Sequence, residues 1–223
     1  MKKLSLFCLF LISGYTYSQD CKGYYFLQNN KTVEVTVYDK DGKENGKVVH
    51  KVSNVTAISN GVSAVINTEN FNKKGKSTST ASNTIKCAGG VMMMDIKMGL
   101  SKEQQKPYAA TAQTDNAFIE YPANLKTGDN LKDAAINLHS NLNGMEQSTE
   151  MQTTNRKVLA KETITSPAGT WECYKISYSC KITTKVMSMS IPINVEGTEW
   201  FSPGFGIVKT ETKYGTTLVT SIQ

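Results

Sequence analysis

Residues 31–43 read KTVEVTVYDKDGK, and this stretch decides the fold class. Val33, Val35 and Val37 alternate with polar residues, which is the pattern of a strand with one buried face. The segment Asp39–Gly42 follows directly. Its Asp can start a turn and its Gly tolerates a positive φ, as hairpin loops require. The stretch therefore predicts a strand and a reversal into an antiparallel neighbour.

The same combination of alternation and turn recurs along the chain. Residues 72–76 nearly repeat the first turn, and Gly- or Pro-containing reversals follow at intervals. We predict strands at 31–38, 43–58, 61–71, 76–87, 90–97, 115–121, 131–142, 145–164, 170–186, 190–201, 205–213 and 216–222. The parity of the alternation changes near Val186, which predicts a bulge or a bend. Ser101 and Gln104 can cap one short helix before Pro107.

The predicted fold class is all-β. We expect a single domain of ten or more mostly antiparallel, meandering strands at residues 19–223, with at most one or two short helices. So many consecutive strands imply a strongly curved sheet that forms a half-barrel or a barrel.

The first eighteen residues have the features of a secretory signal peptide, which we expect at residues 1–18 and removed from the mature protein. Lys2 and Lys3 precede an apolar run from Leu4 to Ile12, and small residues lie before Gln19. The run is shorter than the roughly 20 apolar residues that span a membrane. Cys21 lacks the run-up of small residues that a lipoprotein requires. We therefore predict an exported, soluble protein, periplasmic or secreted, that does not span a membrane.

The charge pattern argues against nucleic acid as a partner. Removal of Lys2 and Lys3 lowers the formal net charge from +6 to about +4. Nearly all the basic residues are scattered lysines, and Arg156 is the only arginine. Sites for nucleic acid favour arginine because its fork-shaped group binds bases and phosphates in pairs.

Four cysteines remain after residue 18, an even number that suggests disulfides in an oxidising compartment. Cys173 and Cys180 fall on one predicted strand, roughly 23 Å apart. A disulfide needs Cα atoms within about 7 Å, so this pair is excluded. The other connectivities stay open. Among them we favour a Cys21–Cys87 bridge that ties the N-terminus to the sheet and leaves Cys173 and Cys180 free.

The sequence offers no recognisable catalytic or cofactor site. His50 and His139 are the only histidines, and neither lies in a catalytic motif. Gly204-Phe205-Gly206 resembles a dinucleotide loop, but no helical pattern follows it. We predict a protein that is not an enzyme and that has no cofactor and no metal.

Methionines gather in two places and permit two interpretations. Thioethers bind Cu(I), so Met92 and Met94 could bind copper with Met187, Met189 or a cysteine. Methionine also fills irregular apolar space and adapts to varied apolar partners, which we favour. On the concave face of a curved sheet, such side chains could hold a lipid-like molecule. The candidate ligand-binding residues are Met92, Met94, Tyr174, Ile176, Tyr178, Ile182, Met187 and Met189.

Several longer motifs carry a family resemblance. They are Cys21–Tyr25, Tyr38–Lys43, Glu120–Pro122, Leu125–Ala134, Asn155–Val158, Thr165–Ile176, Glu199–Phe201 and Gly204–Lys209. Together they resemble the TapB-like family, a domain-of-unknown-function group of exported proteins from Gram-negative bacteria. The resemblance covers nearly the whole mature chain. It implies a curved antiparallel sheet like that of periplasmic lipoprotein carriers, supports Cys21 and Cys87 as a structural pair, and implies no catalytic residue.

The sequence is compatible with two functions. The first is an exported, non-enzymatic protein that binds or carries an apolar, lipid-like ligand in its curved sheet. The second is a structural or protein-interaction module of the envelope with a filled core. Its protein partner is unknown. A cavity of several hundred Å³ favours the first function, and a solid core with an exposed apolar patch favours the second.

Overall fold

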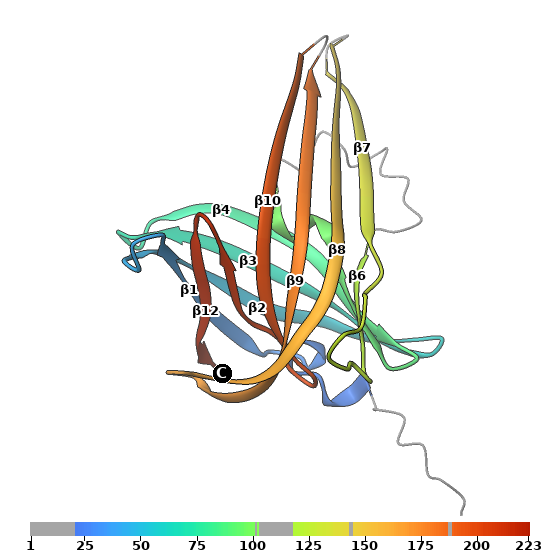
Figure 1. Ribbon diagram of the computed structural model, residues 1–223, viewed down its shortest axis with the longest axis vertical. Helices are drawn as coiled ribbons and strands as arrows, with labels where there is room; N and C mark the ends of the chain where they lie inside the picture. The colour runs from blue at the N-terminus through green and yellow to red at the C-terminus, as the bar shows by residue number, and fades with distance from the viewer. Residues whose placement is uncertain (1–20, 101, 103–117, 143–144, 187–188) are drawn as a thin grey trace, which may run out of the picture.

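The computed structural model describes residues 21–100, 102, 118–142, 145–186 and 189–223 (Figure 1). The predicted signal peptide and the short helix after Ser101 lie outside these residues. The strands are β1 (Thr32–Asp39), β2 (Glu44–Ile58), β3 (Gly61–Asn72), β4 (Ser77–Ala88), β5 (Val91–Asp95), β6 (Phe118–Pro122), β7 (Ala134–Leu142), β8 (Met145–Ser166), β9 (Gly169–Val186), β10 (Met189–Ser202), β11 (Gly206–Thr212) and β12 (Gly215–Ile222). The described residues also form three 3-10 helices: η1 (Cys21–Gly23), η2 (Tyr25–Leu27) and η3 (Ile96–Gly99).

All the strands belong to one antiparallel sheet. Its spatial order is β6-β5-β4-β3-β2-β1-β12-β11-β10-β9-β8-β7, so β1 pairs with both β2 and β12. The edge strands β6 and β7 lie against each other without forming a continuous ladder. The sheet is therefore a nearly closed barrel with one seam, and the predicted all-β, meandering architecture is confirmed.

The predicted strand positions agree closely with the structure, and two details differ. The parity change near Val186 marks a hairpin rather than a bulge, because Val186 pairs directly with Met189. The alternation changes there because two different strands meet. The strand predicted at 90–97 ends earlier, because the carboxylate of Asp95 accepts a hydrogen bond from the backbone N–H of Lys97 and caps η3.

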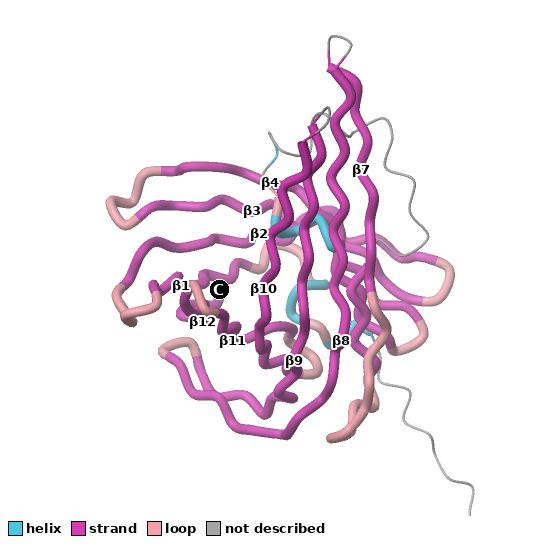
Figure 2. The backbone as a smooth tube through the Cα atoms, turned by 45° about the horizontal axis from the view of Figure 1, so that its top comes forward, coloured by secondary structure: helices cyan, strands magenta, loops and turns pink. Residues whose placement is uncertain are grey.

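The strands differ greatly in length, and the difference shapes the molecule. β8 has 22 residues and β9 has 18, whereas β5 and β6 have 5 each. As a result, β7 to β10 rise well beyond the rest of the barrel as a tall sheet (Figure 1). A view in which the top of the molecule is turned forward shows that β1, β12 and β11 curve round to meet this tall sheet (Figure 2).

The core fills one part of the barrel interior. Tyr121 of β6 and Phe201 of β10 stack face to face, with ring centroids 4.3 Å apart. Phe205 follows β10 and contacts Phe26 of η2 and Trp171 of β9, at centroid distances of 5.7 and 5.3 Å. Aromatic side chains bury large apolar areas, so this cluster stabilises the meeting of N-terminal, central and C-terminal segments.

The described chain contains no helix that is both long and apolar enough to cross a membrane.

Candidate functional site

A cavity of about 670 Å³ lies inside the barrel beside the aromatic core. This volume falls within the range of small-molecule sites, roughly 300–1,000 Å³. Its apolar and thiol lining consists of Phe26, Val35, Val48, Met94, Ile96, Met98, Leu100, Ile119, Tyr121, Met151, Tyr178, Cys180, Ile182, Ile207 and Val208. Its polar lining consists of His50, Thr68, Asn70, Ser79, Asp95, Thr153, Arg156, Glu199, Thr210 and Thr217.

The size of the inward-facing side chains explains why the protein itself does not fill this space. Inward positions of β3 and β4 carry Thr68, Asn70 and Ser79, which are too small to reach the opposite wall. Across the barrel, the inward residues of β9 are larger and apolar. Strand alternation thus brings small polar side chains from β3 and β4 and larger apolar side chains from β9 to the same space.

Three of the predicted ligand-binding residues line the cavity: Met94 on β5, Tyr178 and Ile182 on β9. The ring of Tyr178 lies across β10 at Gly197, where an added Cβ would come within 2.4 Å of it. Glycine at this position therefore lets the phenol fold flat along the wall.

The structure places the other predicted residues elsewhere. Met92 and Ile176 are fully buried in the main core. Tyr174 packs against the same core and does not line the cavity. Met189 is 65% exposed, and Met187 lies outside the described residues. Shared parity on a strand predicted the face correctly, but it did not predict how far along the strand the core ends.

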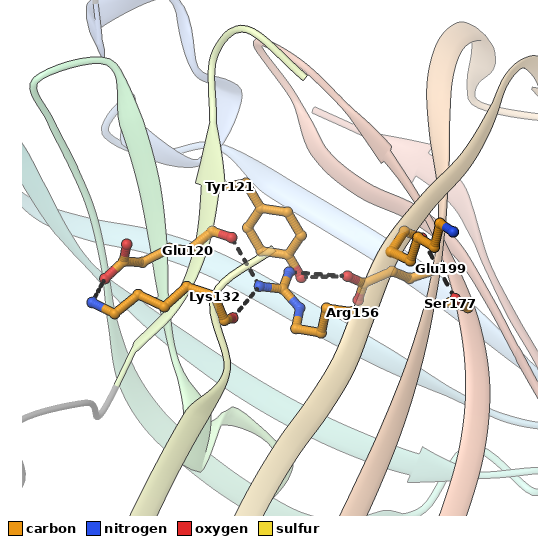
Figure 3. Close-up of polar contacts among 7 residues, drawn as sticks. Glu120, Tyr121, Lys132, Arg156, Ser177 and Glu199 are labelled. Atoms are coloured by element: carbon orange, nitrogen blue, oxygen red, sulfur yellow. Dashed lines mark hydrogen bonds and ion pairs between the residues drawn. The ribbon is translucent and has the colours of Figure 1, made fainter. Parts of the chain in front are cut away.

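Sequence reasoning did not single out the polar cluster of Tyr121, Arg156 and Glu199, which borders the cavity and whose contacts are drawn in Figure 3. Glu199 of β10 accepts two hydrogen bonds on Oε1, from the hydroxyl of Tyr121 at 2.9 Å and from Nη2 of Arg156 at 3.4 Å. The guanidinium also lies over the Tyr121 ring, 4.7 Å from its centroid. The available signal was that Arg156 is the one arginine of the sequence, on a strand whose other basic residues are lysines.

Burial and the charge of Arg156 shift the pKa of Glu199 in opposite directions. Desolvation raises the pKa of Glu199, while Arg156 and the Tyr121 hydroxyl act in the opposite direction. Burial and the neighbouring Glu199 raise the pKa of Tyr121 well above its usual range, so the phenol stays protonated and donates. The cluster can hold a charged pair in an apolar wall because each charge has a partner.

Arg156 also fastens the seam of the barrel. Its Nη1 donates to the backbone carbonyls of Glu120 in β6, at 3.0 Å, and of Lys132 just before β7, at 3.2 Å. Lys132 and Glu120 add an ion pair of 2.9 Å at the surface. One side chain from β8 thus joins both edges of the sheet where the backbone ladder is interrupted.

A bulge in β8 sets the position of Arg156. Asn155 has a φ of 54°, and the pairing of β8 with β9 shifts register between Thr154 and Lys157. Asparagine tolerates this left-handed conformation better than most residues. The backbone carbonyl of Arg156 then accepts from the N–H of Leu131 at 2.8 Å. The bulge lets the side chain turn inward while its backbone holds the segment before β7.

His50 of β2 lines the cavity, and its pKa is well below the ordinary value. Its Nδ1 is 2.9 Å from the hydroxyl of Thr68, and its ring contacts Phe26. Burial lowers the pKa of His50 to about 4, so the imidazole is neutral at ordinary pH.

The predicted disulfide between Cys21 and Cys87 is present, with Cα atoms 5.4 Å apart. Cys173 and Cys180 are free, as predicted. Cys173 is fully buried, and burial raises the pKa of its thiol to about 12. Cys180 lines the cavity, so its thiol reports on that space.

The described residues form no group of three or more His, Cys, Asp or Glu side chains that could hold a metal. The alternative copper site is also dispersed. Met92 lies in the core, Met94 at the cavity and Met189 in solvent.

An apolar row continues from the cavity along the inner face of β10. Ile193 pairs with the cavity residue Ile182 across β9 and β10, so the two side chains share a face. Ile193, Ile191 and Met189 are 48%, 59% and 65% exposed, so exposure increases toward the tip of the tall sheet.

Comparison with known proteins gives a family and a fold. A family model described as DUF3108-like matches residues 28–221. No curated protein matches the sequence.

Two solved structures share the fold. One is a Bacteroides fragilis protein described as exported, with a YmcC-like fold. It is 22% identical, with a TM-score of 0.65 over 88% of this chain and 96% of that one. The other is a Parabacteroides distasonis protein described as a lipoprotein. It is 23% identical, with a TM-score of 0.68 over 92% of this chain and all of that one.

Proposed function

The chain belongs to the DUF3108-like family, and from this premise we propose that it is a non-enzymatic binding protein for an apolar or amphiphilic small molecule. The observation that carries the proposal is the 670 Å³ cavity inside the barrel, whose lining combines a majority of apolar side chains with polar groups that include Glu199 and Arg156. Binding sites for small molecules typically combine these features.

Two further observations support this function over that of an interaction module with a filled core. Met94, Met98 and Met151 line the cavity, and methionine adapts its shape to varied apolar guests. The cavity also borders both buried clusters, the main core at Tyr121 and a second cluster at Ile96 and Met151. The side chains of these two clusters do not fill the space between the strands.

We further propose that the protein acts after export, as a soluble mature chain in the periplasm or outside the cell. The features of residues 1–18 support this, and so does the disulfide, which forms in oxidising compartments. The related structures include one protein described as exported and one described as a lipoprotein. The more specific resemblance to the TapB-like family, within or beside the DUF3108-like family, stays a prediction.

The test is native mass spectrometry of mature protein purified from a bacterial periplasm without detergent. We expect an added mass that organic solvent releases and that is identified as a lipid-like molecule. Ile182→Trp fills the cavity and should abolish the added mass. Leu159→Trp, at a position of β8 that is 44% exposed, is the matched control and should retain it.

Cys180 supplies a second readout in the same protein. A maleimide reagent should label its cavity-facing thiol faster after extraction with solvent than before it, whereas the buried Cys173 stays unlabelled throughout. A bare chain mass, together with equal labelling rates before and after extraction, would contradict the proposal and favour the interaction module.

A further inference from the structure

The carboxyl group of Glu199 has one oxygen engaged and one available. Both hydrogen bonds that the described residues make to it, from Tyr121 and Arg156, end on Oε1. No described residue donates to Oε2. The residue is 7% exposed, and it lines the cavity. A ligand group that donates to Oε2 would form a hydrogen bond to a charged acceptor there, which is stronger than one between neutral groups.

The guanidinium beside it is not available to a ligand in the same way. The Nη atoms of Arg156 already bind Glu199 and the carbonyls of Glu120 and Lys132. Its Nε has no partner among the described residues, but the side chain has no exposed surface through which a ligand could reach that donor. Its charge is compensated within the wall. An incoming carboxylate would therefore meet the carboxylate of Glu199 before any free cation.

The other charged groups of the lining do not change this balance. Asp95 adds a second carboxyl group, which pairs with Lys97 at 3.5 Å outside the lining. His50 is neutral. The lining thus holds two carboxyl groups and one guanidinium, which disfavours anions in the cavity.

The register between β9 and β10 indicates the direction in which the apolar chain of a ligand would lie in the cavity. Glu199 pairs with Ile176, which is buried in the main core. Tyr178, Cys180 and Ile182 follow on the same face of β9, and Ile193 lies opposite Ile182. Ile193 lies six positions before Glu199 on β10, which is about 20 Å along the strand. The polar group is therefore deepest, and the apolar face leads outward.

Resting on the proposed function, we infer that the ligand is a single-chain amphiphile with a hydrogen-bond-donating head, such as an alcohol or an amine. The head donates to Oε2 of Glu199, and the chain runs along the strands toward Ile182 and Ile193. A free fatty acid of the same length is disfavoured, because its carboxylate would face that of Glu199.

The experiment compares three probes of equal chain length: hexadecanol, hexadecylamine and hexadecanoic acid. Each competes with a fluorescent apolar dye on solvent-extracted protein at neutral pH. We expect the alcohol and the amine to bind at least about tenfold more tightly than the acid, as one hydrogen bond to a charged group allows.

Glu199→Gln supplies the decisive variant. The amide retains an acceptor for Tyr121 and Arg156, presents a donor to the cavity and leaves the Arg156 charge uncompensated. The preference should then reverse toward the acid. Glu162→Gln is the matched control, because Glu162 accepts from the Trp200 indole at 2.9 Å and does not line the cavity. It should keep the wild-type order.

Each outcome is decisive. Equal or tighter binding of the acid to the wild-type protein overturns the inference and leaves the proposed function standing. Failure of the dye and of all three probes to bind overturns both. If Glu199→Gln does not fold, the order of affinities in the wild-type protein decides by itself.

Discussion

At the residue scale, the cavity depends on buried polar side chains whose surroundings set their ionisation. His50 illustrates this. Its ring lies against Thr68 and Phe26, and burial disfavours the charged form, so its pKa falls to about 4. Glu199 shows the reverse trend for an acid, because burial raises its pKa against the effect of Arg156. Neither state follows from residue type alone, because both depend on what covers the side chain.

His50 should make the protein sensitive to mild acid. Its pKa is about 4 when folded and about 6.5 when unfolded, so the unfolded chain binds more protons between these values. The contribution to stability is fully present above pH 6.5 and is lost as the pH falls toward 4, by up to about 3 kcal/mol. Urea unfolding at a series of pH values measures it.

His50→Gln should flatten the pH dependence over this interval. His139→Gln, at an exposed position of β7, is the matched control and should keep the wild-type dependence. Equal pH dependence of the wild-type protein and His50→Gln would contradict the role assigned to His50.

At the element scale, β8 performs two tasks. It pairs with β9 along nearly its full length, and its bulge at Asn155 turns Arg156 toward the seam. The edge strands β6 and β7 are short of partners there, and unpaired edges are liable to open or to accept foreign strands. The hydrogen bonds from Arg156 to both sides of the seam replace the missing ladder.

Arg156→Met should therefore destabilise the protein far more than the loss of a surface charge. It removes a donor from two carbonyls and leaves the buried Glu199 carboxyl without its cationic partner, which costs about 3–5 kcal/mol for a buried pair. Urea unfolding gives the stability, and hydrogen exchange should show faster opening of β6 amides.

Lys132→Met is the matched control, because it removes only the surface partner of Glu120, whose contribution is about 1 kcal/mol or less. If the two variants were equally stable, Arg156 would not fasten the seam.

At the scale of the whole molecule, closure brings distant segments together. Tyr121, Arg156 and Glu199 come from β6, β8 and β10, and they meet only because the sheet curves back on itself. The disulfide adds a second long-range tie, from η1 to β4 across 66 residues. Together they hold the N-terminal segment and the edge strands against the aromatic core that borders the cavity.

Removal of the disulfide should lower the free energy of unfolding by about 4 kcal/mol, because a closed loop of this length restricts the unfolded chain. Cys21→Ser with Cys87→Ser tests this in urea, and reduction of the wild-type protein should give the same loss. Cys180→Ser, which leaves the disulfide intact, should remain sensitive to reductant. Stability unaffected by reductant in the wild-type protein would contradict the prediction.

The sequence by itself determined the strands and the turns, and it favoured the Cys21–Cys87 pair without excluding the other connectivities. Alternation reports which face of a strand is buried, and Asx-Gly turns report where the chain reverses, so both are local properties visible at Val33 or Gly42. Only the tertiary structure decided which inward residues meet empty space. Ile176 and Ile182 share a face of β9, yet one is in the core and the other lines the cavity. That difference arises from what stands across the barrel, as does the meeting of Arg156 with Glu199, because closure is set by contacts between segments far apart in the chain.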